Sequence, residues 1–364
     1  MARALVTGGC GFIGRHLVEC LLSQGFDVRI LDVADPDGRP EGAAFRRGSI
    51  LDGGDLEAAM RGVDRVFHVA GISHLWVRRR ADLAEVNARG TERVLRAAAA
   101  ARVRRVVHCS TEAVLLAERL PPLSAMAGPY TRSKHAAEAA ALAAARDGLD
   151  VVIASPTVPI GAEDRNLTPP AAMLARFLAG RTPAYLDCTL NLVGVRDVAA
   201  GLALAGDHGL PGERYVLGGE TVALRDLLAE VERVSGRRMP RLTLPASLAL
   251  PVAGLAEWVA DHVTGAPPAA TREGVRLALR AARVDDRTAR TALGYRPAPI
   301  AGALAEAVQW LCATGRSVAA SRTGAPVPRG ATERGSKPPV GSTLGRGARL
   351  RASAAAPPRE PLGR

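Results

Sequence analysis

The amino-acid sequence predicts an α/β protein built on a doubly wound parallel sheet, with a smaller, mostly helical lobe and a disordered C-terminal tail. Three observations predict this fold class. Short apolar runs alternate with helical stretches over residues 1–160, a glycine-rich turn directly follows the first apolar run, and the composition changes twice further along the chain. Strands separated by helices of this length are typical of parallel sheets with helices on both faces.

The expected elements follow one another in a regular order. Residues 1–160 contain the sheet, with strands expected at 2–8, 27–32, 64–71, 104–111 and 149–156 and helices at 12–24, 55–61, 91–103 and 130–146. Residues 161–314 form most of the second lobe, which is interleaved with the first around 190–220. Its helix at 224–236 ends at a glycine, as a helix C-cap often does. The last helix is expected at 302–315.

One segment of the second lobe leaves two interpretations open. Residues 244–263 read LPASLALPVAGLAEWVADHV and are rich in Ala, Leu and Pro. We expect a buried amphipathic helix here, while contact with an apolar ligand or a membrane surface is the alternative.

Charge is concentrated in the tail. The chain of 364 residues carries 48 Lys and Arg and a net charge of +12. Residues 315–364 hold ten basic and two acidic residues, so they account for +8 and leave 12 − 8 = +4 for residues 1–314. The tail is rich in Pro, Gly, Ser and Ala, which predicts disorder. We therefore expect no specific nucleic-acid partner and at most a peripheral membrane contact.

The five cysteines are scattered, without a CxxC pair or a Cys/His cluster. This argues against a disulfide framework and a metal site, and favours a reducing, cytoplasmic location. The chain enters a strand pattern at its first residues, so no leader is expected.

A glycine turn joins the first strand to the first helix. Gly8, Gly11 and Gly14 lie in VTGGCGFIG with the spacing G-x-x-G-x-x-G. Glycines let the backbone approach a pyrophosphate closely, and the helix N-terminus offers unpaired N–H groups to that anion. The second expected strand ends at Asp32, where a carboxylate accepts hydrogen bonds from a ribose and repels a 2′-phosphate. The pattern predicts a dinucleotide-binding Rossmann fold with NAD as cofactor, and NADP as the alternative because arginines follow at 39, 46 and 47.

Lys134 is the only lysine in residues 1–314 and follows Tyr130 by four residues. On a helix the two side chains lie on one face, one turn apart. An ammonium beside a phenol, together with an oxidised nicotinamide, favours the phenolate and allows proton transfer near neutral pH. Arginine has a different shape and reach, which gives a physical reason for a lysine here. The pair predicts an acid–base site.

Hydroxyl groups follow the strand expected at 104–111. Ser110 and Thr111 stand at its carboxyl end, where ligands bind in such sheets. We expect one of them to hold a substrate oxygen. His74 and Trp76 follow the preceding strand, and either substrate recognition or simple packing would explain them.

Together these motifs resemble the extended short-chain dehydrogenase/reductase superfamily, over roughly residues 2–314. TGGCGFIG, HVAG, VNARGT, the hydroxyl pair and YTRSK occur in the superfamily's order. The resemblance implies that Tyr130 donates or accepts the proton with Lys134 as its partner, that Thr111 takes the catalytic Ser/Thr position, and that Asn87 lies on the nicotinamide side. It implies cofactor contacts at Gly8, Gly11, Phe12, Ile13, Gly14, Asp32, Ile50, Val69, Ala70, Gly71, Tyr130 and Lys134.

Later segments, among them SPTVPIGAEDRNLTPP and ALGYRP, are similar to hopanoid-associated sugar epimerases and dihydroflavonol-4-reductase-like proteins, and STEAVLL is similar to 3β-hydroxysteroid dehydrogenases. Ser155 departs from the Asn that sugar-nucleotide epimerases usually carry. We therefore expect hydride transfer at a secondary alcohol or ketone of a sugar, terpenoid or sterol-like small molecule. The alternatives are a hopanoid-associated sugar epimerase with tightly bound NAD and a non-catalytic nicotinamide-binding scaffold. A homodimer is implied by analogy only.

Overall fold

A seven-stranded parallel sheet forms the first part of the molecule. The computed structural model describes residues 2–34, 39–115, 120–280 and 284–316, so nearly all of the predicted tail lies outside the described residues. The sheet has the order β10-β6-β5-β4-β1-β2-β3, and every neighbouring pair is parallel. Its strands are β1 (Arg3–Thr7), β2 (Asp27–Asp32), β3 (Ala44–Arg47), β4 (Arg65–His68), β5 (Arg105–Cys109), β6 (Val151–Pro156) and β10 (Arg214–Leu217). The predicted doubly wound fold class is confirmed.

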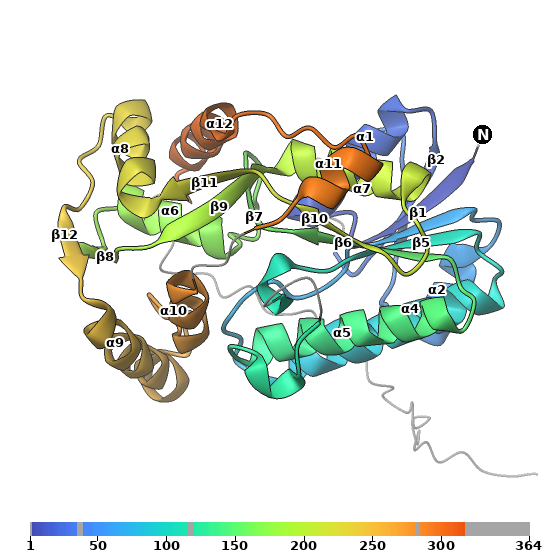
Figure 1. Ribbon diagram of the computed structural model, residues 1–364, viewed down its shortest axis with the longest axis horizontal. Helices are drawn as coiled ribbons and strands as arrows, with labels where there is room; N and C mark the ends of the chain where they lie inside the picture. Colours follow the sequence, from blue (N-terminus) through green and yellow to red (C-terminus); the bar gives the residue numbers. More distant parts are fainter. Residues whose placement is uncertain (1, 35–38, 116–119, 281–283, 317–364) are drawn as a thin grey trace, which may run out of the picture. The chain divides into compact units, whose positions relative to one another are not determined.

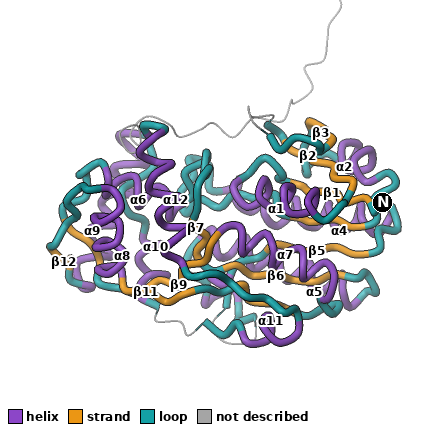
Figure 2. Tube along the Cα trace, turned by 90° about the horizontal axis from the view of Figure 1, so that it is seen from above, coloured by secondary structure: helices purple, strands orange, loops and turns teal. Residues whose placement is uncertain are grey.

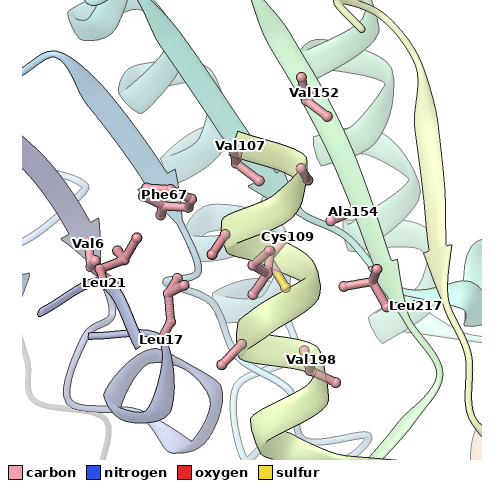
Figure 3. Packing of buried hydrophobic residues seen from close by; sticks show 14 of the residues in the cluster. Val6, Leu17, Leu21, Phe67, Val107, Cys109, Val152, Ala154, Val198 and Leu217 are labelled. Atoms are coloured by element: carbon pink, nitrogen blue, oxygen red, sulfur yellow. The ribbon is translucent and has the colours of Figure 1, made fainter. Parts of the chain in front are cut away.

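Helices cover both faces of this sheet (Figure 1). One face is covered by α1 (Phe12–Ser23) and α7 (Val195–His208), and the other by α2 (Gly53–Met60), α4 (Gly90–Ala100) and α5 (Pro129–Arg146). Figure 3 shows Leu17 of α1 and Val198 of α7 in the same buried cluster as the strand side chains Val107 and Ala154. The strand interiors read as continuous apolar runs because both faces are buried.

The second lobe lies beyond the carboxyl ends of the strands. Figure 2 shows its helices gathered at one end of the sheet, away from the N-terminus. They are α6 (Pro169–Leu178), α8 (Leu224–Ser235), α9 (Ala246–Val259), α10 (Arg272–Leu279) and α12 (Ile300–Ala313). Gly236 caps α8 with φ +66°, as the sequence predicts.

The lobe also contains short strands that the sequence pattern did not reveal. They are β7 (Val158–Ile160), β9 (Thr189–Gly194) and β11 (Glu220–Ala223) in one sheet, and β8 (Ala184–Leu186) and β12 (Leu242–Leu244) in another. Four of the five strands have only three or four residues, too few for a period of two to stand out in the sequence. Other short elements join the larger ones: α3 (Ala81–Leu83), η1 (Ala84–Arg89), η2 (Glu112–Val114), η3 (Leu123–Ala125), η4 (Ala260–Thr264) and α11 (Arg287–Ala292).

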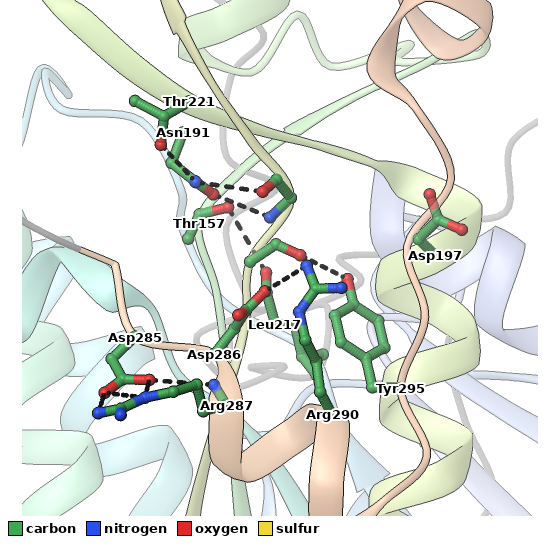
Figure 4. A network of polar contacts seen from close by, with 12 residues as sticks. Thr157, Asn191, Asp197, Leu217, Thr221, Asp285, Asp286, Arg287, Arg290 and Tyr295 are labelled. Atoms are coloured by element: carbon green, nitrogen blue, oxygen red, sulfur yellow. Dashed lines mark hydrogen bonds and ion pairs between the residues drawn. The ribbon is translucent and has the colours of Figure 1, made fainter.

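Hydrogen bonds fix the passage from sheet to lobe after β10 (Figure 4). The Asn191 amide accepts from the Gly219 N–H at 2.9 Å and donates to the Thr221 hydroxyl at 3.0 Å. The buried Tyr295 hydroxyl donates to the Gly218 carbonyl at 3.0 Å. These hydrogen bonds therefore hold the segment that connects β10 to the lobe.

The expectation for residues 244–263 was wrong in one respect. A helix forms, but its large apolar side chains Leu248, Val252, Leu255 and Trp258 are exposed, and its fully buried residues are Ala249, Ala253 and Gly254. The sequence could not show this, because nearly every position of the segment is apolar. Within the described residues, no helix is long and apolar enough to cross a membrane.

Candidate active site

The glycine turn between β1 and α1 is packed so closely that side chains would not fit. A Cβ on Gly14 would lie 2.1 Å from the Gly8 carbonyl oxygen, and one on Gly8 would lie 2.6 Å from the Ala70 Cα. Gly8 has φ +73°, which favours glycine, and Gly11 is the N-cap of α1. The first N–H groups of α1 therefore face a backbone cradle that fits a pyrophosphate.

Asp32, the last residue of β2, is bonded to this turn. Its Oδ2 accepts from the Cys10 N–H at 3.0 Å and its Oδ1 from the Ala34 N–H at 3.3 Å. Burial raises the pKa of the carboxyl above its usual value, and these backbone donors oppose the shift. The side chain is only half-buried, so the carboxylate can still accept bonds from a ribose. The turn and Asp32 together fit a dinucleotide.

Of the other residues expected to contact the cofactor, some lie at the carboxyl edge of the main sheet and some pack behind it. Val69, Ala70 and Gly71 follow β4, and the Val69 N–H donates to the Thr7 carbonyl at 3.1 Å. Ile13 packs against the core beneath α1, whereas the Ile50 side chain contacts the position where Gly90 lacks a Cβ. The Phe12 ring instead contacts the lobe, beside Ile160 and Gly161.

Tyr130 and Lys134 lie one turn apart on α5, and each has a partner at the end of β5. The Tyr130 phenol is hydrogen-bonded to the Thr111 side chain. The Lys134 ammonium donates to the Cys109 carbonyl at 2.7 Å. The phenol, the ammonium and the Thr111 hydroxyl therefore meet at the carboxyl edge of the sheet, as the sequence predicts for parallel strands.

The net effect of the protein around Tyr130 is to raise the pKa of its phenol. Burial raises it above the usual value of 10, with further increases from the charges of Cys109, Glu273 and Glu112, while the bond to Thr111 opposes the shift. Burial also lowers the pKa of Lys134. Forming a phenolate here therefore requires additional positive charge beside Tyr130.

Asn87 lies in η1 and is buried, with its amide engaged on both sides. Its Oδ1 accepts from the Ile72 N–H at 2.7 Å, and its Nδ2 donates to the Ile72 carbonyl at 3.0 Å and the Ser133 hydroxyl at 2.9 Å. It thus ties the loop after β4 to helix α5. These contacts make it a positioning residue for that loop.

The structure separates Ser110 from Thr111. The buried Ser110 hydroxyl donates to Glu138, and Glu138 also accepts from the Arg214 Nε at 2.6 Å. This buried cluster joins β5, α5 and β10. Sequence reasoning missed it, although Glu138 stands eight residues after Tyr130, at helical spacing on the same face.

Sequence reasoning also missed Glu273 of α10, which caps the helix that carries Tyr130. Its Oε2 accepts from the Tyr130 N–H at 3.1 Å, and its Oε1 from the Thr131 N–H at 2.7 Å and the Thr131 hydroxyl at 2.8 Å. The side chain is buried and occupies the space where Gly128 lacks a Cβ. A carboxylate satisfies the unpaired N–H groups and complements the dipole at a helix N-terminus. Nothing in the sequence connects residues 142 positions apart.

Two buried histidines stand behind the site. His68 and His108 lie with ring centroids 5.4 Å apart, and the His68 nitrogens are bonded to Thr7 and Thr91 hydroxyls at 2.8 and 2.9 Å. Within the described residues, neither His108 nitrogen has a hydrogen-bond partner. Burial, and then the charge of Lys134, lowers the pKa of His68 to about 3 and that of His108 well below 6.5.

A pocket lies beside Pro129, at the N-terminal end of α5. Its lining includes Leu75, Trp76 and Leu83 together with Glu273 and Arg276. Trp76 donates from its indole N–H to Asp261 at 2.8 Å, whereas His74 is bonded to the Asn166 carbonyl at 3.2 Å. In the described part of the chain no group of His, Cys, Asp and Glu is placed to hold a metal ion.

Comparisons with known proteins agree with this geometry. The model of the NAD dependent epimerase/dehydratase family matches residues 4–218. A Synechocystis protein named "Putative dihydroflavonol 4-reductase" is 36% identical, over 84% of this chain and 93% of its own length. Sterol demethylase protein B of Methylococcus capsulatus is 31% identical, over 84% and 97%. A Stigmatella aurantiaca protein named 4-hydroxy-2-methyl-3-oxo-4-farnesyl-3,4-dihydroquinoline-1-oxide ketoreductase is 34% identical, over 80% and 91%.

Among solved structures, DesIV from Streptomyces venezuelae, a dTDP-glucose 4,6-dehydratase with bound NAD, is similar at 27% identity with a TM-score of 0.66. The match covers 85% of this chain and 97% of DesIV.

Removing the Glu273 cap should weaken both stability and order at the start of α5. Glu273→Ala leaves the buried N–H groups of Tyr130 and Thr131 without an acceptor, which should cost about 1–3 kcal/mol. Urea unfolding measures the loss, and amide exchange of a peptide spanning 128–132 should accelerate. Glu306→Ala breaks an exposed ion pair with Arg196 and should change stability by less than about 1 kcal/mol. Equal effects of the two variants would contradict the capping role.

The buried histidines should make the fold sensitive to acid. The folded-state pKa of His108 lies below its unfolded value, so its contribution to stability is complete above about pH 6.5 and is lost as pH falls toward the folded value. From pH 7 to pH 5 the wild type should lose roughly 1–2 kcal/mol more than His108→Leu. Urea unfolding at both pH values measures this. The exposed His208→Leu is the matched control and should lose as much as the wild type; a wild-type loss no larger than that of His108→Leu would refute the prediction.

Proposed function

This chain belongs to the NAD-dependent epimerase/dehydratase family, and within it we propose a reductase or dehydrogenase that transfers hydride between NAD and a secondary alcohol or ketone of a terpenoid or sterol-like molecule. The observation that carries the proposal is the meeting of Tyr130, Lys134 and Thr111 at the carboxyl edge of the sheet, next to the glycine turn. An acid–base group, a cation and a hydroxyl are what carbonyl reduction requires of the protein.

The roles follow from the contacts. The nicotinamide of the cofactor supplies or accepts the hydride. Thr111 holds the substrate oxygen, because Ser110 is already bonded to Glu138 and Thr111 is the hydroxyl bonded to Tyr130. Tyr130 gives its phenolic proton to that oxygen in reduction and takes it back in oxidation.

Lys134, together with the positive charge of an oxidised nicotinamide, would supply the positive charge that the buried phenol lacks. Burial alone raises the pKa of Tyr130, so a phenolate requires cations nearby. Lys134 is anchored by the Cys109 carbonyl one turn along the same helix, which fixes its charge near the phenol. A flexible, exposed lysine would not hold its charge in this position.

The substrate class rests on three observations. Two relatives with 31% and 34% identity are named for a sterol and for a farnesyl-bearing ketone. The pocket beside Pro129 offers the apolar side chains Leu75, Trp76 and Leu83, although charged residues, among them Arg272 and Glu273, also line it. Ser155, at the position where nucleotide-sugar epimerases usually carry Asn, is completely buried. These features favour an apolar ring system over a nucleotide sugar.

The first experiment separates reductase from epimerase. The purified full chain is denatured and the released nucleotide is identified, and native protein is then mixed with NADH and either a 3-ketosteroid or UDP-glucose. The proposal expects little bound nucleotide and consumption of NADH with the ketone. Stoichiometric bound NAD, with UDP-glucose epimerised and no net NADH consumed, would favour the epimerase alternative. Absence of nucleotide binding in any form would overturn both.

Tyr130→Phe should remove turnover and keep the cofactor. The variant lacks only the hydroxyl, so NADH affinity by fluorescence titration should stay within about twofold. Turnover should fall about 10²–10⁴-fold, as expected for loss of a general acid–base group. Tyr215→Phe is the matched control, because its hydroxyl accepts from the Leu210 N–H inside the core, away from the site. Undiminished turnover in Tyr130→Phe would exclude the mechanism.

A further inference from the structure

In helix α9 the fully buried residues are small, four large apolar residues are exposed, and Leu250 packs partly buried beside the small ones. Ala249 and Ala253 are at most 1% exposed. By contrast, Leu248, Val252, Leu255 and Trp258 are 52%, 48%, 65% and 53% exposed. A helix that only packs against its own domain shows the opposite arrangement. The exposed side chains therefore need another explanation than core packing.

The four large residues form a single stripe. Their spacing of four, three and three residues places them on one face of the helix. Leu242, just before the helix, is 69% exposed, and Val263, just after it, is 68% exposed. We call these six residues the apolar stripe. It extends along the whole of α9, on the side away from the small cluster formed by Ala249, Ala253 and Val275.

The stripe itself is uncharged, since the sequence has no acidic or basic residue between Leu242 and Ala256. The two acids that follow are both in ion pairs. Glu257 lies 3.5 Å from Arg272, and Asp261 lies 2.8 Å from Arg80. Because both carboxylates are paired, neither is an unpaired negative charge that would repel an anionic surface.

Basic residues stand at both ends of the stripe. Arg237, Arg238 and Arg241 precede it in the chain and are exposed. At the other end the exposed Arg78 guanidinium lies 4.0 Å from the Cβ position of Gly265, whereas the neighbouring Arg79 and Arg80 are paired with Asp82 and Asp261. An apolar helix face between arginines complements a lipid surface, whose acyl region takes apolar side chains while anionic headgroups meet the cations.

We propose that the apolar stripe of α9 docks the protein on the surface of an anionic lipid bilayer. Trp258 suits this position, because tryptophan is enriched where membranes meet water. A second copy of the chain fits less well: a stripe with arginines at both ends brings like charges together whichever way it packs on itself. The helix lies along the surface and does not cross it. Docking requires no turnover, so it stands independently of the proposed function.

The test compares two variants of the full chain that differ only in where a charge is added. Leu255→Glu places a carboxylate in the middle of the stripe. Leu210→Glu is the matched control, because Leu210 is 61% exposed and follows α7, on the main sheet's side of the molecule. Both variants retain the basic residues of 315–364, so any contribution of that segment to lipid binding is the same in both. Equal melting temperatures would show that both fold.

Flotation with phosphatidylglycerol vesicles, and in parallel with phosphatidylcholine vesicles, measures the binding. Wild type and Leu210→Glu should float with phosphatidylglycerol, and Leu255→Glu should bind about tenfold more weakly. Quenching by brominated lipid should be lost in Trp258→Phe. The proposal is overturned if wild type does not float, or if all three proteins float equally. It is also overturned if lipid-free wild type is a dimer that Leu255→Glu converts to a monomer, since the stripe would then be a protein interface.

Discussion

The candidate site depends on how helix α5 is held against the sheet. Glu273, from the lobe, accepts from the first N–H groups of α5, and Glu138, in the middle of the helix, binds Ser110 of the sheet edge and Arg214 of β10. Both carboxylates are buried, so each would be costly without its partners. Tyr130 and Lys134 lie between these two anchors. Their positions are therefore fixed from both parts of the molecule.

The polar groups beneath α5 form a continuous buried layer with consequences for charge. His68 and His108 stand neutral behind Lys134, because burial and the nearby ammonium disfavour a further positive charge. Lys134, bonded to the Cys109 carbonyl, is therefore a positive charge beside which the two histidines stay neutral. Because the two histidines stay neutral in the folded protein, the free energy of unfolding falls as the pH is lowered. The same arrangement concentrates the positive charge where proton transfer needs it.

The lobe combines two tasks on neighbouring helices. Helix α10 contributes Glu273 to the start of α5, while α9 packs on α10 through alanines and turns its large apolar side chains to solvent. Trp76 and Arg80 connect the two regions, since both line the pocket beside Pro129 and both bind Asp261 in η4. In the proposed function an apolar substrate would leave a lipid surface close to this pocket. The lobe would then serve delivery as well as recognition.

The sequence predicts five of the seven strands of the main sheet, without β3 and β10, and also the glycine turn, Asp32 and the Tyr130–Lys134 pair. Each of these depends on local spacing, because apolar periodicity defines strands and helices and four residues make about one helical turn. The sequence also indicated Ser110 and Thr111 as a pair. The resemblance favours Thr111 of the two, and the structure adds that Glu138 and Arg214, from elements far along the chain, engage Ser110. The same holds for Glu273, which meets Tyr130 from 143 positions away in the sequence, and for α9, whose uniformly apolar sequence does not distinguish an inner face from an outer one. Local chemistry can be inferred from neighbours in sequence, whereas partners and exposure are set by neighbours in space.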